Sequence, residues 1–355
     1  MKHNFPYNWT LKDAVFTKNK GKVFSCFACG GGSTMGYKLA GFDVIGHNDI
    51  DPKMVEVYKE NHKPKYSYLE SITTFAKRKD LPKELYELDI LDGSPPCSSF
   101  SMAGNRKKDW GKEKKFREGQ ELQVLDTLFF DFIDLAKELQ PKVVVAENVK
   151  GLLLGAAKEY VIKIYKTFDK AGYYCQHFLL DASKMGVPQR RERVFFICLR
   201  KDLAKDFLYW SDMFTQLPKI EMNFNEKEIF YKDIKTNKNG KMLTEDAQKY
   251  WIYRKFGDTS FSDITLRIEG KEKQWNRKFI YEDNVPLTIT AGGYLPVKFD
   301  VPYEINNLEI KLIGSYPIDY DFLKLKSEYL IGMSVPPVMT AQIAKQVYEQ
   351  WLSKI

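Results

Sequence analysis

The residue best suited to covalent chemistry is Cys97, in the stretch GSPPCSSFS of residues 93–101. It follows two prolines just after LDILD, residues 88–92, whose alternation predicts a half-buried strand. Proline fixes its own φ and restricts the residue before it, so the thiol leaves the strand end on a stiff turn. Ligands of open α/β sheets bind at strand ends. A thiolate there could add to an electron-poor ring carbon; the alternative is a buried, inert thiol.

Two further motifs carry groups that such a nucleophile needs. In VVVAENV, residues 143–149, Glu147 lies at the tip of an apolar strand, where a carboxyl can supply or share a proton. In QRRER, residues 189–193, Arg191 and Arg193 alternate ahead of a strand, which predicts that both face one side. Two guanidinium groups suit an oxygen-rich planar ligand or phosphates. A helix-capping acid and an exposed basic strand edge are the alternative interpretations.

A glycine-rich loop predicts a cofactor site. FACGGGSTMG, residues 27–36, follows a strand and opens a helix, so its backbone N–H groups can face a ligand. The dinucleotide pattern G-x-G-x-x-G does not fit it. Asp49 ends the next strand, where a carboxylate can accept hydrogen bonds from ribose hydroxyls. The glycine-rich loop and Asp49 together favour a nucleoside cofactor other than NAD. The alternative is that the loop is only a tight turn between a strand and a helix. Cys26 and Cys29 form a CxxC, but no histidine spacing completes a metal site, so no metal is expected.

The elements that position these residues alternate in type along the first 200 residues. Short apolar runs and helical patterns follow one another, including a helix opened by Asp51 and Pro52, which predicts a doubly wound, mostly parallel α/β sheet. Residues 201–286 are rich in aromatics and short turns, which predicts a separate, smaller, β-leaning insert. The chain closes on an amphipathic pattern, PPVMTAQIAKQVYEQWLSKI, that predicts a helix.

The composition limits the class of protein. The 355 residues are 44% hydrophobic and 29% charged, with no long apolar run and no secretory pattern at the start. Five cysteines, an odd number, favour a reducing compartment, so we expect a cytoplasmic protein that does not enter a membrane. The net charge of +8 tolerates a polyanionic partner. Residues 97–121 carry seven Lys or Arg against four acids, which fits either a solvated loop or one that closes over phosphates.

Taken in order, FACGGG, GSPPCSSFS, AENV, QRRER, LTIT and GMSVPP resemble the motif series of the DNA (cytosine-5) methyltransferases. The resemblance runs from about Val23 to the C-terminus. It implies the class I S-adenosylmethionine-dependent methyltransferase fold, S-adenosyl-L-methionine as methyl donor, and double-stranded DNA as substrate. It also implies methylation at C5 of a flipped-out cytosine, with Cys97 as nucleophile, Glu147 at the ring nitrogen, and Arg191, with Arg193 beside it, holding the base.

The resemblance further implies a cofactor site, with some departures from the family pattern. Its residues are Phe27, Ala28, Cys29, Gly30, Gly31, Gly32, Asp49, Ile50, Ser71, Ile72, Asp92, Pro95, Ser334 and Val335. Cys29 replaces a loop glycine, and Ile50 replaces the aromatic that follows the ribose-binding acid. Ser71 replaces an acid, with Glu70 adjoining it, and Met333 replaces an asparagine.

The resemblance also predicts how the chain is divided into domains. Residues 1–200 and 325–355 would form the catalytic domain, and residues 201–324 the target-recognition domain and hinge. We expect a monomer, with a cognate restriction endonuclease as a separately acting partner. Three alternatives remain: a transfer-RNA cytosine-5 methyltransferase, although the insert lacks that branch's Cys-Phe-Thr; a catalytically inert DNA-binding relative; and an N4-cytosine or N6-adenine enzyme, which Cys97 disfavours. Residues 1–22 have no predicted role.

Overall fold

The structure is a computed structural model that describes residues 3–96, 113–114, 123–124, 127–155, 157–212, 215–273, 275, 277–292 and 294–355. The chain forms two compact units. The sheet unit consists of Val15–Asp181, Glu192–Phe224 and Met339–Ile355. The insert unit consists of Met1–Ala14, Ala182–Arg191 and Asn225–Val338. These units divide the chain differently from the predicted domains, whose catalytic and target-recognition roles stay a prediction.

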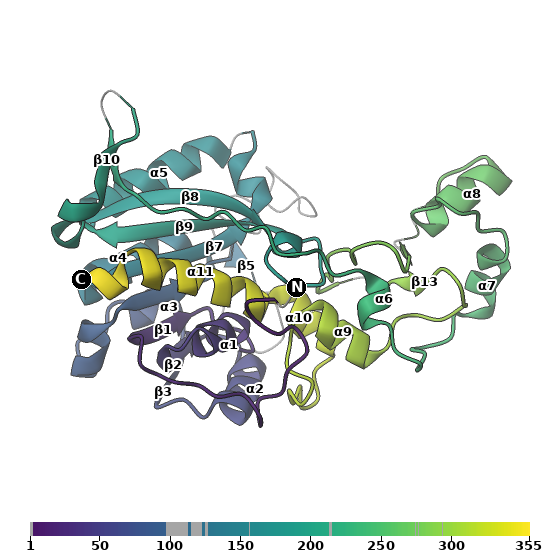
Figure 1. The fold of residues 1–355 in the computed structure, drawn as a ribbon, viewed down its shortest axis with the longest axis horizontal. Coiled ribbons are helices and arrows are strands. Elements are labelled where there is room, and N and C mark those ends of the chain that lie inside the picture. The colour runs from purple at the N-terminus through teal and green to yellow at the C-terminus, as the bar shows by residue number, and fades with distance from the viewer. Residues whose placement is uncertain are drawn as a thin grey trace. The chain divides into compact units, whose positions relative to one another are not determined.

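The sheet unit is built on seven strands in the order β3-β2-β1-β4-β7-β9-β8 (Figure 1). Their bounds are β1 Lys22–Cys26, β2 Asp43–Asp49, β3 Tyr66–Leu69, β4 Ile90–Gly93, β7 Val143–Val149, β8 Tyr173–Asp181 and β9 Glu192–Arg200. Strand β9 runs antiparallel to both of its neighbours, and every other pairing in this sheet is parallel. The predicted mostly parallel α/β sheet is therefore confirmed.

Helices cover the sheet and bury its apolar residues. Those of the sheet unit are α1 Gly32–Leu39, α2 Pro52–His62, α3 Ile72–Phe75, α4 Leu128–Leu139, α5 Ala157–Lys170 and most of α11 Pro337–Gln350. Helices α3, α4 and α5 share one core with Phe24, Leu91 and Val144 of the sheet. Helix α2 begins where the sequence predicts, because the Asp51 carboxylate accepts from the backbone N–H of Lys53 at 2.9 Å. Two short antiparallel pairs, β5 Glu113–Lys114 with β6 Gln123–Val124 and β10 Leu208–Trp210 with β11 Gln216–Pro218, complete this unit.

The described part of the insert unit is mainly helical, so the predicted β-leaning insert is wrong. Its helices are α6 Tyr231–Ile234, α7 Glu245–Trp251, α8 Phe261–Glu269, α9 Asn307–Ile313 and α10 Ser327–Met333, beside the two-residue strands β12 Phe279–Ile280 and β13 Val297–Lys298. Side-chain caps stabilise the N-termini of two of these helices: Ser260 and Asp263 form a capping box at α8, and Asn306 and Glu309 form one at α9. Aromatic residues pack between the helices and these short strands, as Phe261 of α8 does against Phe279 of β12.

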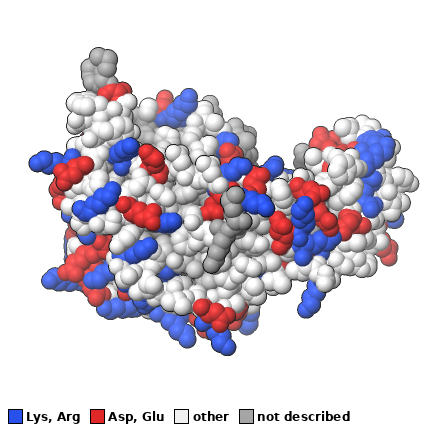
Figure 2. Space-filling model, in the orientation of Figure 1, with Lys and Arg blue, Asp and Glu red and all other residues white. Residues whose placement is uncertain are grey.

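The surface of the sheet unit mixes both signs of charge on the face drawn in Figure 2. Across the described ranges, no helix combines the length and the apolar character that crossing a membrane requires. Within the same ranges, no group of three or more His, Cys, Asp or Glu side chains could hold a metal ion.

Candidate active site

The glycine-rich loop, residues 27–31, joins β1 to α1 beside the end of β2. Phe27, Cys29 and Gly31 adopt φ values of 52°, 51° and 85°, so the loop turns tightly. The backbone N–H of Cys29 donates to Asp49 Oδ2 at 2.7 Å, and that of Asp51 donates to Asp49 Oδ1 at 2.9 Å. The structure therefore brings the predicted ribose-binding acid and the predicted cofactor loop together.

The chemistry of this donor set fits a nucleoside. Both oxygens of the half-buried Asp49 accept backbone hydrogen bonds, and a carboxylate oxygen can accept a further bond from a hydroxyl. Burial raises the pKa of Asp49 to about 6, although bonds from backbone N–H groups act in the opposite direction. Above that pH the group is a carboxylate with its orientation already fixed. Ile50, also half-buried, follows it in the chain and offers an apolar surface.

Helix α2 supports the loop from behind. His62 Nε2 lies 3.2 Å from the carbonyl oxygen of Gly30, and Tyr58 Oη lies 2.8 Å from Thr34 Oγ1. A Cβ on Gly31 would lie 2.2 Å from His62 Nε2, so only glycine fits there. Burial lowers the pKa of His62 well below its usual value, which keeps the ring neutral.

Asp92, a predicted cofactor residue, makes its contacts within the protein. Its Oδ2 accepts hydrogen bonds from Ser25 Oγ and Ser33 Oγ, both at 2.7 Å, and its Oδ1 accepts from Tyr37 Oη at 3.1 Å. The side chain is buried, and burial raises its pKa to about 6. These bonds join β4 to β1 and α1, the two elements that flank the glycine-rich loop, so Asp92 stabilises the position of the loop. Sequence reasoning missed its three hydroxyl partners.

The other predicted cofactor residues of this unit lie on neighbouring elements. Ser71 is the N-cap of α3, because its Oγ accepts from the backbone N–H of Thr74 at 3.1 Å, and Ile72 is buried. The adjoining Glu70 pairs with Arg78 at 2.8 Å. Among the loop residues, Ala28, Gly30, Gly31 and Gly32 are buried and Phe27 and Cys29 are half-buried.

The motifs of the predicted nucleophile and acid meet at the ends of β4 and β7. These strands are parallel, with Gly93 opposite Ala146. Asn148 Nδ2 donates to the carbonyl oxygen of the buried Pro95 at 3.2 Å, which fixes the proline turn against the strand that carries Glu147. Cys97 itself lies outside the described residues, as does most of the basic stretch 97–121. Asn148 was not predicted as a site residue, although it directly follows Glu147 in the sequence.

Glu147 and Arg193 form an ion pair between antiparallel strands. Arg193 on β9 is opposite Val149 on β7, and its Nε lies 3.0 Å from Glu147 Oε1. The side chains are 13% and 17% exposed, Glu147 being the more buried, so the pair is shielded yet accessible to a ligand. A planar ring could therefore meet an acid and a guanidinium at one point.

Arg191 makes different contacts, within the insert unit. Its guanidinium is buried and donates to three backbone carbonyls: Ile289 at 3.3 Å, Gly332 at 3.0 Å and Ser334 at 2.9 Å. It therefore joins the segment LTIT to the segment GMSVPP, where the predicted cofactor residues Ser334 and Val335 are buried. The two arginines that the sequence assigns to one face make separate sets of contacts.

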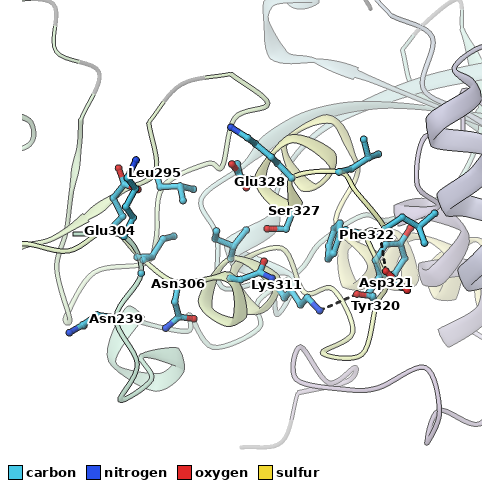
Figure 3. Close-up of a pocket in the computed structure, with 18 residues that line it drawn as sticks. Asn239, Leu295, Glu304, Asn306, Lys311, Tyr320, Asp321, Phe322, Ser327 and Glu328 are labelled. Atoms are coloured by element: carbon cyan, nitrogen blue, oxygen red, sulfur yellow. Dashed lines mark hydrogen bonds between the residues drawn. The ribbon is translucent and has the colours of Figure 1, made fainter. Parts of the chain in front are cut away.

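A polar pocket in the insert unit contains none of the predicted site residues. Its volume is about 680 Å³, and it is lined by parts of residues 239–241, 304–311 and 320–328 together with Leu295. Figure 3 shows Lys311 within it, with Nζ donating to the carbonyl oxygen of Tyr320 at 3.0 Å. The same Nζ donates to the carbonyl of Ile318 at 2.7 Å, so this amine stabilises a loop.

Comparisons with known proteins show which family the chain belongs to. Residues 21–349 match the family described as C-5 cytosine-specific DNA methylase. The Type II methyltransferase M.FnuDI of Fusobacterium nucleatum is 38% identical over 352 residues, which cover 94% of this chain and 96% of that protein. M.NgoPII of Neisseria gonorrhoeae is 36% identical over 197 residues, 54% of this chain and 52% of that protein. A candidate DNA modification methyltransferase from an E. coli prophage shares the fold, with a TM-score of 0.65, 20% identity, and coverage of 93% of this chain and 99% of that one.

Proposed function

Because the chain belongs to the C-5 cytosine-specific DNA methylase family, we propose that it methylates C5 of a cytosine flipped out of double-stranded DNA. Its fold is the class I methyltransferase fold. One observation carries the proposal: the Pro95 turn, Glu147 and Arg193 meet at the ends of β4, β7 and β9, joined by contacts of 3.2 and 3.0 Å. This is the arrangement that a nucleophile, an acid and a base-holding cation require.

The cofactor of the proposed reaction is S-adenosyl-L-methionine, which the family implies. Asp49 would accept its ribose hydroxyls, residues 27–32 would lie against it, and Ile50 would cover its adenine. Asp92 and His62 would fix the position of the loop through their contacts with Ser33 and Gly30. When bound, the cofactor supplies a methyl group on a sulfonium, to which a nucleophilic carbon bonds as the neutral thioether leaves. No metal takes part in this proposal.

The residues of the chain make the cytosine ring reactive. The Cys97 thiolate forms a bond to C6, and Glu147 supplies or shares a proton at N3, so the π electrons of the C5–C6 bond become available at C5. Arg193 orients Glu147 and donates to the exocyclic carbonyl oxygen of the cytosine. After C5 is methylated, a base removes the C5 proton, the C5–C6 double bond re-forms, and the Cys97 sulfur leaves as thiolate. Arg191 does not contact the ring in this proposal; it holds the segments LTIT and GMSVPP together.

The substrate must leave the double helix before this chemistry can begin. In the double helix, neighbouring bases cover the ring face through which a thiolate must reach C6, and base pairing occupies N3, so the base is flipped into the site. We propose that residues 201–324 read the surrounding sequence and that residues 1–200 with 325–355 carry out catalysis, as a cytoplasmic monomer. The relatives are named as Type II methyltransferases, which supports a restriction endonuclease as a separately acting partner.

The test is base-resolution sequencing of DNA from a methylation-free host that expresses the chain. The wild type is expected to give 5-methylcytosine in one sequence context, whereas Cys97→Ala and Glu147→Gln give none. Cys175→Ala is the matched control, since this buried cysteine lies on β8, outside the proposed site. Unmodified DNA from the wild type would contradict the proposal. So would 5-methylcytosine found only in RNA, which would favour the transfer-RNA branch.

A further inference from the structure

The connection between α7 and α8, residues 252–258, exposes three large hydrophobic side chains. Phe256 is 89% exposed, Ile252 63% and Tyr253 54%. We refer to these seven residues as the α7–α8 loop. Single exposed hydrophobic residues are common on protein surfaces, but three within five consecutive positions form a patch. A patch of this kind indicates an interaction surface.

The backbone of this loop is fixed although its hydrophobic side chains are exposed. Arg267 on α8 donates to both oxygens of the buried Asp258, at 2.7 and 2.8 Å, and to the carbonyl of Tyr253 at 2.8 Å. Asp258 also accepts from the backbone N–H of Lys255 at 2.7 Å. Tyr281 Oη donates to the carbonyl of Asp258 at 2.6 Å. The patch is therefore preorganised, which lowers the entropy that binding would cost.

Two cations, Arg254 and Lys255, belong to the α7–α8 loop. Arg254 lies over the Trp251 ring, 3.2 Å from its centroid, and its Nε donates to the carbonyl of Phe299 at 2.6 Å, while Lys255 is exposed. Residues 245–278, from the start of α7 onward, contain eight Lys or Arg and six Asp or Glu, an excess of two positive charges. In Figure 2, Lys and Arg side chains gather where Figure 1 labels α8. Exposed aromatics among cations match a ligand with apolar base edges and a phosphate backbone.

We infer that the α7–α8 loop enters the major groove of the target DNA, where Phe256 and Tyr253 contact base edges and Lys255 contacts a phosphate. This inference rests on the proposed function and identifies the segment of the insert that determines sequence specificity. Contacts to base edges discriminate between sequences, whereas a phosphate contact does not. The two kinds of residue therefore give different signatures in binding experiments.

The test measures the affinity of the full chain, by fluorescence anisotropy at several salt concentrations, for a duplex with the mapped site and for a scrambled duplex. Phe256→Ala is expected to weaken binding to the site about 10- to 100-fold, the loss typical of one buried Phe side chain, with the salt slope unchanged. Lys255→Ala is expected to weaken both duplexes and to reduce the slope by about 1. Ile318→Ala is the matched control, an exposed hydrophobic residue in the connection between α9 and α10 of the same unit.

The outcomes separate this inference from the proposed function. If the wild type methylates DNA but Phe256→Ala binds the site as tightly as Ile318→Ala does, the inference is overturned and the proposed function stands. A variant that changes self-association on gel filtration, with DNA affinity intact, would also overturn it, because a second copy would then occupy the patch. If the wild type leaves DNA unmodified, the proposed function fails as well. Thermal melts of Phe256→Ala should match the wild type, since the side chain is exposed.

Discussion

Replacing Gly31 with alanine tests whether the cofactor loop depends on support from α2. Gly31 has a φ of +85°, which an L-residue adopts only with strain. The new Cβ would lie 2.2 Å from His62 Nε2, 2.6 Å from His62 Cδ2 and 3.1 Å from Tyr58 Cδ2. Because the His62 ring is buried and within hydrogen-bonding distance of Gly30, it has little room to move.

The expected cost has two parts. The left-handed backbone conformation contributes about 1–2 kcal/mol. Overpacking against the buried ring adds about 1–3 kcal/mol. Gly172→Ala is the matched control, since Gly172 has a φ of +95° but nothing within 4 Å of the position of its Cβ. That variant should lose only the first part, so the difference between the two variants measures the contact with His62.

The assay is urea unfolding followed by circular dichroism, with cofactor affinity measured by calorimetry. Gly31→Ala is expected to lower the free energy of unfolding by about 1–3 kcal/mol more than Gly172→Ala and to weaken cofactor binding, which Gly172→Ala leaves intact. Adding His62→Ala should recover part of the loss as a favourable coupling energy. Equal destabilisation by the two glycine variants, or no coupling with His62, would show that contact with the His62 ring does not contribute.

Three further variants test the contacts around the site. Burial raises the pKa of Asp92 to about 6 from an ordinary 3.8, so its contribution to stability is complete below about pH 4 and is lost as the pH rises through 6. Asp92→Asn should remove about 3 kcal/mol of that pH dependence while Asp49 keeps its own; urea titrations at pH 4 and 7 with an unchanged difference would contradict this. A lysine at position 191 cannot donate to all three carbonyls as the guanidinium does, so Arg191→Lys should lower the free energy of unfolding by about 1–3 kcal/mol. Arg190→Lys should leave it unchanged, because Arg190 is exposed. Equal melting temperatures of the two variants would show that the Arg191 contacts do not stabilise the protein. Arg193→Gln should lower kcat about 100- to 1,000-fold with DNA affinity nearly unchanged, and a normal kcat would remove its role beside Glu147.

Local patterns predicted the parts of the site that are close in sequence. The strand, glycine loop and helix of residues 22–39 follow one another directly, and Asp49 ends the next parallel strand. Because strands and helices alternate in an α/β fold, the loop and Asp49 are expected to lie at the same edge of the sheet. The pairing of Asp92 with Ser25 and Ser33 depends on β4 lying beside β1, which is a long-range contact. No pattern within either segment carries that information.

The two arginines show where a local rule fails. Alternation places Arg191 and Arg193 on one face only if both belong to one strand, but β9 begins at Glu192. Arg191 precedes the strand and bonds to carbonyls of the insert unit, so the pattern did not apply to it. The N-terminal residues, which had no predicted role, include the buried Trp9, whose Nε1 donates to the carbonyl of Ser315 at 3.0 Å. Its partner lies 306 positions away, beyond the reach of any sequence pattern.

Covalent trapping on a duplex that carries 5-fluorocytosine at the mapped site would show whether Cys97 bonds to the cytosine ring. Fluorine at C5 cannot be removed as a cation, so the bond between Cys97 and C6 should persist once C5 is methylated. With the cofactor present, we expect a complex that survives denaturant, and mass spectrometry should find the modified base on the peptide containing Cys97. Glu147→Gln should form the complex far more slowly, and Cys97→Ala should form none. A wild-type protein that methylates ordinary DNA yet gives no such complex, or gives one through another residue, would contradict the account.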